Sequence, residues 1–351
     1  HCTVVYDPND NSTTSAIEDE AGYNTAYTIK SNMFTRRGYR FVGWNEAKDG
    51  SGKDWTESIG KSFTWTTENR ITLYAQWEID ESQTKELNYI IQYYKENQLQ
   101  TNDTKKIKST VQLLQPDTIT IDKGNIDTNK YNGYVFNNIV INNIEYNSLN
   151  KIPSNVVTET IIRVNYRKRN DLRYTVNYLE KKTNKVIHEA KTQRNMTLGD
   201  VITSENEKIE IDGYVYESVT PEKLTIGTGE NVINIYYSKR RDLKFKVNYL
   251  EKGSSRKLHE SKIQENMTFD DTIISEDQVI PIEGYEYDSA DKLRIKITAG
   301  ENIINLYYTK RNDLSYTVNY LEKDTNKVLH NAKVVENKTF EDVVTSSDEV
   351  I

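Results

Sequence analysis

The chain of 351 residues has little cysteine, little glycine and no long apolar run. Cys2 is its single cysteine, so no internal disulfide can form. Glycine occurs 15 times against 25 tyrosines, which favours strands over flexible linkers. No stretch of 18 apolar residues is present, so nothing in this sequence spans a membrane. The net charge is −7 with no basic stripe, which argues against nucleic acid as a partner.

The sequence also has no signal peptide and no sorting motif. It begins inside a strand-like run, "HCTVVYDPN", and stops at Ile351, 39 residues into a repeat. We therefore expect a piece of a longer protein, whose address labels would lie outside the piece. The final segment, 313–351, should lack strands that its neighbours have. Either the chain continues or this end should be the most mobile part.

One pattern of thirteen residues is written three times. It reads "RNDLRYTVNYLEK" from Arg169, "RRDLKFKVNYLEK" from Arg240 and "RNDLSYTVNYLEK" from Arg311, in steps of 71 residues. A period of this length indicates tandem modules. The sequence divides into 1–80, which holds all four tryptophans; 86–170, a divergent copy with 14 additional residues; the complete copies 171–241 and 242–312; and the truncated copy 313–351.

Within a copy, strand patterns surround one helix-like segment. "LRYTVNY" from Leu172 alternates apolar and polar residues and predicts a strand, and a polar turn leads to a second strand near Ile187. Thr197 is followed three residues later by Asp200, with apolar residues at helical spacing, which predicts a short helix. "GYVYE" and "NVINIYY" predict the last two strands.

These elements predict an α+β fold with one helix laid across a small mixed sheet. If the first and last strands pair side by side, they are parallel and joined by a right-handed crossover. That arrangement is the β-grasp, or ubiquitin-like, fold. The short junctions "SKRRD" and "TKRND" predict an elongated, strand-rich rod of tandem β-grasp modules with small, wet interfaces, present as a monomeric array.

Two families of bacterial surface modules resemble parts of the chain. "YTVNYLE", "GYVYE" and "INIYY" resemble the MucBP (mucin-binding protein) repeats of Gram-positive surface proteins, over roughly 86–351. "RRGYRFVGWNEAKDGSGKDW" from Arg36 and "ITLYAQW" from Ile71 are similar to the Listeria–Bacteroides repeat, also found as the B repeat of internalins. That resemblance implies a strand around Gly38–Trp44 and a last strand at Tyr74–Trp77. Both imply an extracellular location on the bacterial cell surface or cell wall, and neither implies a catalytic residue.

The residues that commonly perform chemistry have simpler interpretations here. One histidine per copy stands alone, Cys2 has no activating neighbour except His1, and a metal site needs several convergent ligands. The recurring carboxylates fit turns and caps better than glycoside hydrolysis, "KDGSGKD" from Lys48 fits a glycine turn better than a calcium loop, and the Asn-x-Ser/Thr sequons fit caps better than glycosylation. The histidines are His188, His259 and His330, the glutamates are Glu180, Glu251 and Glu322, and the aspartates are Asp200, Asp271 and Asp342. We predict no enzyme, no cofactor and no metal.

The tyrosines of the last strand suggest a binding surface. If Ile233, Ile235 and Tyr237 face inward, Tyr236 points to the other face, as Tyr307 does in the next copy. An exposed tyrosine near Asn and Arg side chains can stack on a sugar, although it can equally pack against a module. The sequence predicts a stalk or adhesion region that binds mucin or other host glycans and glycoproteins. The alternatives are a pure spacer or the accessory tail of an extracellular enzyme.

Overall fold

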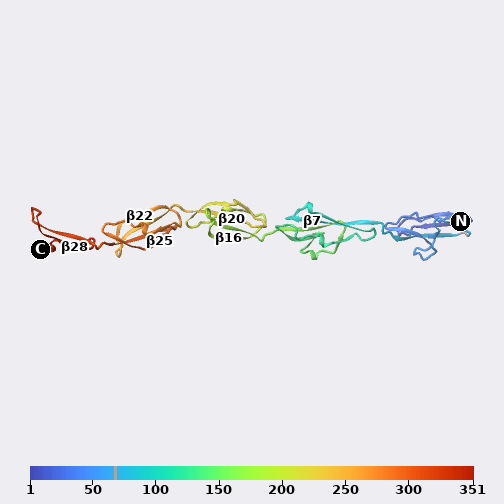
Figure 1. The fold of residues 1–351 in the computed structure, drawn as a ribbon. Helices are drawn as coiled ribbons and strands as arrows, with labels where there is room; N and C mark the ends of the chain where they lie inside the picture. The colour runs from blue at the N-terminus through green and yellow to red at the C-terminus, as the bar shows by residue number, and fades with distance from the viewer. Residues whose placement is uncertain (67–68) are drawn as a thin grey trace. The chain divides into compact units, whose positions relative to one another are not determined.

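The structure is a computed structural model that describes residues 1–66 and 69–351. It divides into two compact units, His1–Arg169 and Asn170–Ile351. Elements carry the labels of Figure 1. Strands dominate both units, and across the described residues the helical elements are 3-10 turns of three or four residues, with no α-helix. The side chains of these strands alternate between a buried face and a polar face, as the sequence pattern predicted.

Residues 171–241 form a four-stranded sheet and a two-stranded one. The larger sheet has the order β16-β15-β20-β18, and β17 pairs with β19. The first and last strands, β15 and β20, pair in parallel, and the other pairs are antiparallel, so the expected hairpin and parallel pairing are confirmed. The bounds are β15 (Leu172–Glu180), β16 (Val186–Met196), β17 (Val201–Thr203), η5 (Ser204–Glu207), β18 (Tyr214–Thr220), β19 (Lys223–Thr225) and β20 (Val232–Lys239).

The predicted helix does not form, so the α+β fold class was wrong. The Asp200 carboxylate does accept a hydrogen bond from the Thr197 N–H at 2.8 Å, but it closes a single turn. Gly199 has φ +86°, a left-handed conformation that a right-handed helix cannot contain. Its N–H donates to the Ile226 carbonyl at 2.8 Å, and β17 then pairs with β19. The chain is almost entirely β, and without a helix over the sheet the β-grasp assignment is not supported.

Tyrosine hydroxyls hold the crossover, the irregular segment 204–213 between β17 and β18. The Tyr237 hydroxyl accepts from the Ile209 N–H at 3.0 Å and donates to the Ile209 carbonyl at 2.8 Å. The Tyr178 hydroxyl donates to the Glu207 carbonyl at 3.2 Å. Because buried backbone groups need partners, these contacts satisfy backbone groups of Glu207 and Ile209 that pair with no strand. The core beneath them includes Val176, which is fully buried.

Residues 242–312 repeat this architecture. Their sheet order is β22-β21-β26-β24, with β23 paired to β25, and the parallel pair is β21 and β26. Asp270 occupies the position of Gly199 with φ +68°, so the helix is excluded here too. The bounds are β21 (Leu243–Glu251), β22 (Lys257–Met267), β23 (Thr272–Ile274), η6 (Glu276–Gln278), β24 (Tyr285–Ala290), β25 (Arg294–Lys296) and β26 (Ile303–Lys310).

Residues 313–351 form the hairpin and one 3-10 turn. Strand β27 (Leu314–Leu321) pairs with β28 (Val328–Lys338), and η7 (Ser346–Glu349) follows. Along β27 no residue is buried, whereas every second residue of the matching β15 is buried. The Tyr320 hydroxyl still donates to the Glu349 carbonyl, at 3.2 Å. The hairpin therefore forms with the same local contacts but with little burial.

The tryptophan-containing segment has the same strand order despite its different sequence. Its sheet runs β2-β1-β6-β4 with β1 and β6 parallel, and β3 pairs with β5. The strands expected around Gly38–Trp44 and Tyr74–Trp77 are present as β4 and β6. Trp44 is fully buried in the core of this segment. The bounds are β1 (Cys2–Asp7), β2 (Ile17–Ala21), β3 (Ala26–Thr28), β4 (Tyr39–Asn45), η1 (Thr56–Ser58), β5 (Ser62–Thr64) and β6 (Arg70–Ile79).

The divergent copy keeps the order and adds strands. Its sheet contains β9-β7-β14-β11, with β7 and β14 parallel, and β10 pairs with β13. The additional residues supply β12 at the edge of β11 and β8 beside β7. The bounds are β7 (Thr84–Lys95), β8 (Gln98–Leu99), η2 (Thr101–Asp103), β9 (Lys105–Gln112), β10 (Thr118–Thr120), η3 (Lys123–Asn125), β11 (Tyr134–Ile141), β12 (Ile144–Tyr146), η4 (Leu149–Lys151), β13 (Asn155–Val157) and β14 (Thr160–Lys168).

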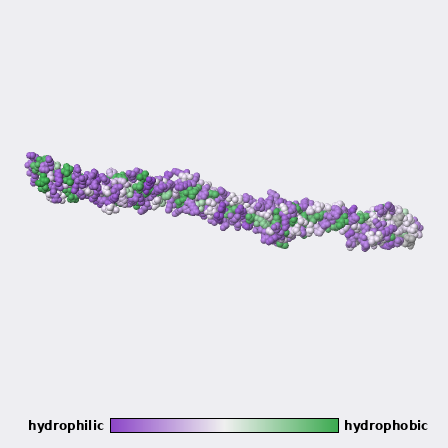
Figure 2. All heavy atoms as spheres, turned by 60° about the horizontal axis from the view of Figure 1, so that its bottom comes forward, coloured by the Kyte–Doolittle hydropathy of each residue, from purple (hydrophilic) through white to green (hydrophobic). Residues whose placement is uncertain are grey.

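The surface is largely polar. On the face drawn in Figure 2, hydrophilic residues predominate and hydrophobic residues form small separate groups. Among the described residues, no helix has the length and apolar character to cross a membrane.

Candidate ligand-contact sites

Tyr236 lies on the outer face of its sheet, as the alternation predicted. Ile233 and Ile235 are fully buried and Tyr237 is 1% exposed, while Tyr236 between them is half-buried. Tyr307 has the same placement in β26. The two rings belong to separate sheets, so each is a contact point of its own.

The surroundings of the two tyrosines differ. The Lys181 ammonium lies 4.6 Å from the centroid of the Tyr236 ring. At Tyr307 the corresponding lysine, Lys252, instead forms an ion pair with Asp288 at 2.7 Å. On both sheets an asparagine pair bridges the parallel strands on this face. These pairs are Asn177 with Asn234 at 2.9 Å and Asn248 with Asn305 at 2.8 Å.

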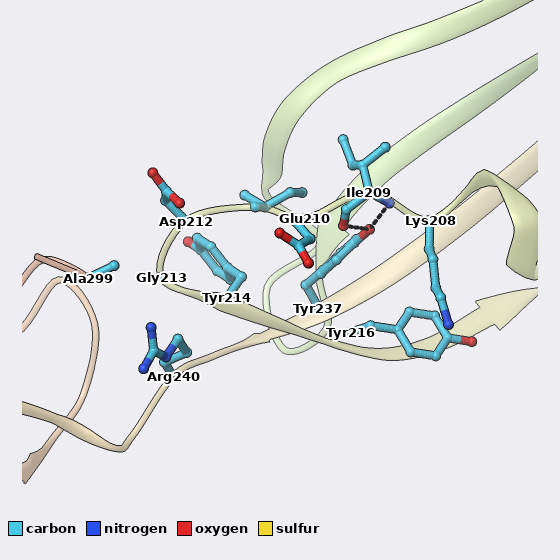
Figure 3. Close-up of a pocket in the computed structure, with 11 residues that line it drawn as sticks. Lys208, Ile209, Glu210, Asp212, Gly213, Tyr214, Tyr216, Tyr237, Arg240 and Ala299 are labelled. Carbon is cyan, nitrogen blue, oxygen red and sulfur yellow. Dashed lines mark hydrogen bonds between the residues drawn. The ribbon is translucent and has the colours of Figure 1, made fainter.

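A second candidate is an open groove of about 470 Å³ beside the crossover of the copy 171–241. Figure 3 shows Tyr216 and Lys208 at one end and Arg240 and Ala299 at the other, with Tyr237 between them. We call it the crossover groove. It is lined by Lys208, Ile209, Glu210, Ile211, Asp212, Gly213, Tyr214, Tyr216, Tyr237, Arg240 and Ala299. Sequence reasoning did not find it, since no motif marks it.

The groove combines an exposed ring with charges of both signs. Tyr216 is 36% exposed and lies edge-on to Tyr237, with ring centroids 6.3 Å apart. The Lys208 ammonium is 5.1 Å from the Tyr216 ring and 3.1 Å from the Glu205 carboxylate. Arg240 binds the Asp242 carboxylate through two hydrogen bonds of 2.9 Å. Such a surface can stack against the carbon face of a small polar molecule and bond to its hydroxyl groups.

The carboxylates of Glu210 and Asp212 line the same groove. Within the described part of the chain, neither carboxylate forms an ion pair or a side-chain hydrogen bond. They are therefore available as hydrogen-bond acceptors. In the next copy Val279 and Pro281 occupy the positions of Lys208 and Glu210, so the groove chemistry is specific to one copy.

The histidines remain separate surface residues. Each ring lies edge-on to a tyrosine of the neighbouring strand, at 5.4 Å for His188, 5.6 Å for His259 and 5.4 Å for His330. Over the described residues, no group of three or more His, Cys, Asp or Glu side chains is arranged to hold a metal ion. Cys2 is 1% exposed and belongs to the core of the first segment.

The recurring carboxylates have structural partners. Asp271 and Asp342 accept from the N–H groups of Thr268 and Thr339 at 3.3 and 2.9 Å, as Asp200 does from Thr197. The recurring glutamates accept from a hydroxyl in the hairpin turn: Thr183 for Glu180, Ser254 for Glu251 and Thr325 for Glu322. The Ser254 hydroxyl bond is the main cause that lowers the pKa of Glu251.

Backbone geometry gives structural reasons for the Lys48 loop and for the sequon asparagines. The Lys48 loop is a tight turn in which Gly50 has φ +78° and Asp49 accepts from the Ser51 N–H at 3.0 Å. The sequon residues Asn195, Asn266 and Asn337 all have φ near +58°. Asparagine tolerates this left-handed conformation better than most residues, which accounts for its presence there.

The comparisons with known proteins bear mainly on the first segment. A family model described as the Listeria-Bacteroides repeat domain (List_Bact_rpt) matches residues 3–76. No curated protein matches the chain. Among solved structures, the chain is similar to one titled "Crystal structure of Mub-RV", at 12% identity over 40% of this chain and 99% of that chain, with a TM-score of 0.16.

Proposed function

We propose that the chain is a non-catalytic repeat region of a bacterial surface protein, located outside the cell, that contacts mucin or other host glycans. The observation that carries this proposal is the match of residues 3–76 to the Listeria-Bacteroides repeat domain. It is supported by the recurrence of one strand order in 1–80, 86–170, 171–241 and 242–312. Repetition of one scaffold suits a protein that presents many weak contacts rather than one reaction centre.

In this proposal each of these segments is one module, and 313–351 contributes the hairpin of a further one. The modules from residue 86 onward are of the MucBP-like type. The chain acts as a monomeric array, without nucleic acid or a cofactor. What is repeated in the complete copies is the sheet and its outer face, and the crossover groove is an addition in 171–241.

Sugar contact is assigned to the outer-face tyrosines and to the crossover groove. A tyrosine ring offers an apolar face for the C–H side of a sugar, and neighbouring amides or carboxylates accept its hydroxyl protons. Tyr236 and Tyr307 each stand two residues from the asparagine of a bridging pair. In the groove, Tyr216 offers the ring and Glu210 with Asp212 offer the acceptors.

A spacer that displays another domain is the second candidate. It is favoured by the contacts between consecutive copies within 170–351, in which Phe269 and Phe340 pack on glycines of the preceding copy. A spacer needs such contacts and needs no ligand.

Glycan-array and mucin-retention measurements on the full chain separate these functions. We expect weak binding that falls when Tyr216, Tyr236 and Tyr307 are each replaced by alanine. Tyr23→Ala, at a 54% exposed tyrosine of the first segment, is the matched control and should leave binding unchanged. The absence of any retention by the wild-type chain would favour the spacer.

A further inference from the structure

Backbone hydrogen bonds join the copies 171–241 and 242–312. Gly213 precedes β18 with φ +80°, and its carbonyl accepts from the Arg240 N–H at 2.8 Å. The Arg240 carbonyl in turn accepts from the Phe269 N–H at 2.8 Å. Arg240, in the short segment between β20 and β21 that we call the linker, is thus bonded to both copies.

The Phe269 side chain then packs directly on the glycine. A Cβ atom at Gly213 would lie 2.2 Å from Phe269 Cδ2, far inside contact distance, so only glycine leaves room for the ring. The Phe269 ring is also edge-on to Tyr214 at 5.3 Å and 62°. An aromatic pair of this geometry contributes about 0.5–1.5 kcal/mol beyond its burial.

The same contact is built again between 242–312 and 313–351. A Cβ at Gly284 would lie 2.3 Å from Phe340 Cδ2, and the Phe340 ring is edge-on to Tyr285 at 5.5 Å and 68°. The Arg311 N–H donates to the Gly284 carbonyl at 2.9 Å, and its carbonyl accepts from the Phe340 N–H at 2.8 Å. Phe340 packs against the core of the preceding copy, whereas Phe269 packs against the core of its own copy as well as on Gly213.

Ion pairs lie around each of the two phenylalanine rings, and the residues that form them differ between the two contacts. At the first contact, Asp270 lies 3.4 Å from Lys239 of the preceding copy and 2.9 Å from Lys296. At the second, Glu341 lies 2.8 Å from Lys310 and 3.2 Å from Arg256, both of the preceding copy. Partly exposed pairs contribute little individually, so the rings and backbone bonds carry the contact.

A third version occurs within the first unit. Leu114 of the divergent copy packs on Gly38 of the first segment, where a Cβ would lie 2.5 Å from Leu114 Cγ. The Gly38 carbonyl accepts from the Asp80 N–H at 3.0 Å and from the Gln112 amide at 3.1 Å. An aliphatic side chain here replaces the ring, and Leu114 is 40% exposed.

We propose that the rings of Phe269 and Phe340, packed on the glycine seats Gly213 and Gly284, hold each copy to the copy before it. The joined copies then reorient as one body, and we call this contact the lock. The linker then behaves as a fixed joint rather than as a hinge, even though the ion pairs around it are exposed and screened by salt. The lock needs no ligand, and it stands whether or not the chain binds glycans.

Distances between spin labels on the full chain test the lock. Labels at Glu189→Cys and Glu265→Cys, both exposed on edge strands of the two copies, are placed in a Cys2→Ala background. Double electron–electron resonance should give one narrow distance distribution. Phe269→Ala should replace it with a broad one. Gly213→Ala should also broaden the distance distribution, because the added methyl group displaces the Phe269 ring. This second variant leaves the copy 242–312 unchanged, so it tests the contact even if Phe269→Ala destabilises that copy.

Phe340→Ala is the matched control, because it empties the equivalent seat at Gly284 but leaves the measured joint intact. Its distribution should stay as narrow as that of the parent. The proposal is overturned if the parent distribution is already broad, or if both Phe269→Ala and Gly213→Ala leave it narrow while circular dichroism shows the chains folded.

Discussion

The complete copies 171–241 and 242–312 share a framework and differ in the chemistry placed on it. Both have the same strand order, and both have a bulge at the same point of the strand that follows the glycine, between Tyr216 and Ser218 and between Tyr287 and Ser289. Several of the differences lie in and beside the crossover. Tyr174, Glu207, Lys208 and Glu210 of the first copy are replaced by Phe245, Gln278, Val279 and Pro281 in the second.

The difference shows that the framework depends on the strands and on the tyrosines that hold the crossover. The Tyr308 hydroxyl bonds to the Ile280 N–H and carbonyl at 3.2 and 3.0 Å, as Tyr237 does to Ile209. The Tyr249 hydroxyl bonds to the Gln278 carbonyl at 3.2 Å, so replacing Glu207 by a glutamine does not remove this contact. The crossover side chains are therefore free to vary, and this is where a ligand preference can differ between copies.

The largest expected effect tests whether the two cores are equivalent. Ile235 and Leu306 occupy the same position of the last strand and are both fully buried. Replacing either by alanine should cost about 2–5 kcal/mol of local stability, because a cavity is left in a packed core. Hydrogen exchange followed by mass spectrometry should show each loss confined to its own copy. Loss of protection in both copies from one substitution would mean that the two cores are not independent of each other.

The strands of this framework were predictable because their signal is local. Alternation from Leu172 to Tyr178 and in "NVINIYY" reports which face is buried, and the 71-residue period reports the number of copies. The face assigned to Tyr236 follows from the same alternation. The parallel pairing was derived from the order of the elements and from the expectation that the first and last strands are neighbours.

The crossover was mispredicted because its conformation depends on distant partners. Thr197 and Asp200 form the turn that a helix start would form, and the next step is decided by the left-handed residue at Gly199 and by pairing with β19. Only one copy has glycine there; Asp270 and Glu341 take the same conformation without a sequence signal. The crossover groove was missed for the same reason, since Tyr237 positions it from 28 residues away.

The next largest effect concerns the tyrosines that hold the crossover. Tyr237→Phe and Tyr308→Phe each remove a hydroxyl that bonds to two backbone groups, and each should cost about 1–2 kcal/mol in its own copy. Hydrogen exchange at Lys208–Gly213 and at 279–284 measures the loss. Tyr236→Phe, on the opposite face of the same strand, is the control and should change little. Equal losses for Tyr236→Phe and Tyr237→Phe would contradict the role assigned to Tyr237.

A smaller effect at alkaline pH comes from Tyr174, which the copy 242–312 replaces by Phe245. Burial, followed by the hydrogen bond to Glu207 at 2.9 Å, raises the pKa of Tyr174 to about 12. A raised pKa means that the folded state holds the proton more tightly. The stabilisation is therefore complete below pH 10, the ordinary value for tyrosine, and is lost as the pH rises through about 12. Phe245 at this position gives the second copy no such contribution.

Thermal denaturation of the wild type and of Tyr174→Phe between pH 9 and 12 measures this difference. The variant should lose less stability over that range than the wild type, since the tyrosines that both proteins retain contribute equally to the two curves. If the stability of the two proteins depends on pH in the same way, Tyr174 does not make the two copies differ in their stability at alkaline pH.

The smallest expected effect is at Lys208, which is lysine in one copy and valine in the other. Its ion pair with Glu205 joins side chains that are 49% and 58% exposed, so it contributes little. The ammonium over Tyr216 adds about 0.5–1 kcal/mol at an exposed site. Lys208→Val should therefore cost less than about 1 kcal/mol. The reciprocal Val279→Lys places a lysine three residues after Glu276 and near Tyr287, so it should rebuild the same contacts and slow exchange at 276–284 slightly. A loss at Lys208→Val as large as that of Tyr237→Phe would mean that the groove side chains, and not the tyrosine hydroxyls, hold the crossover.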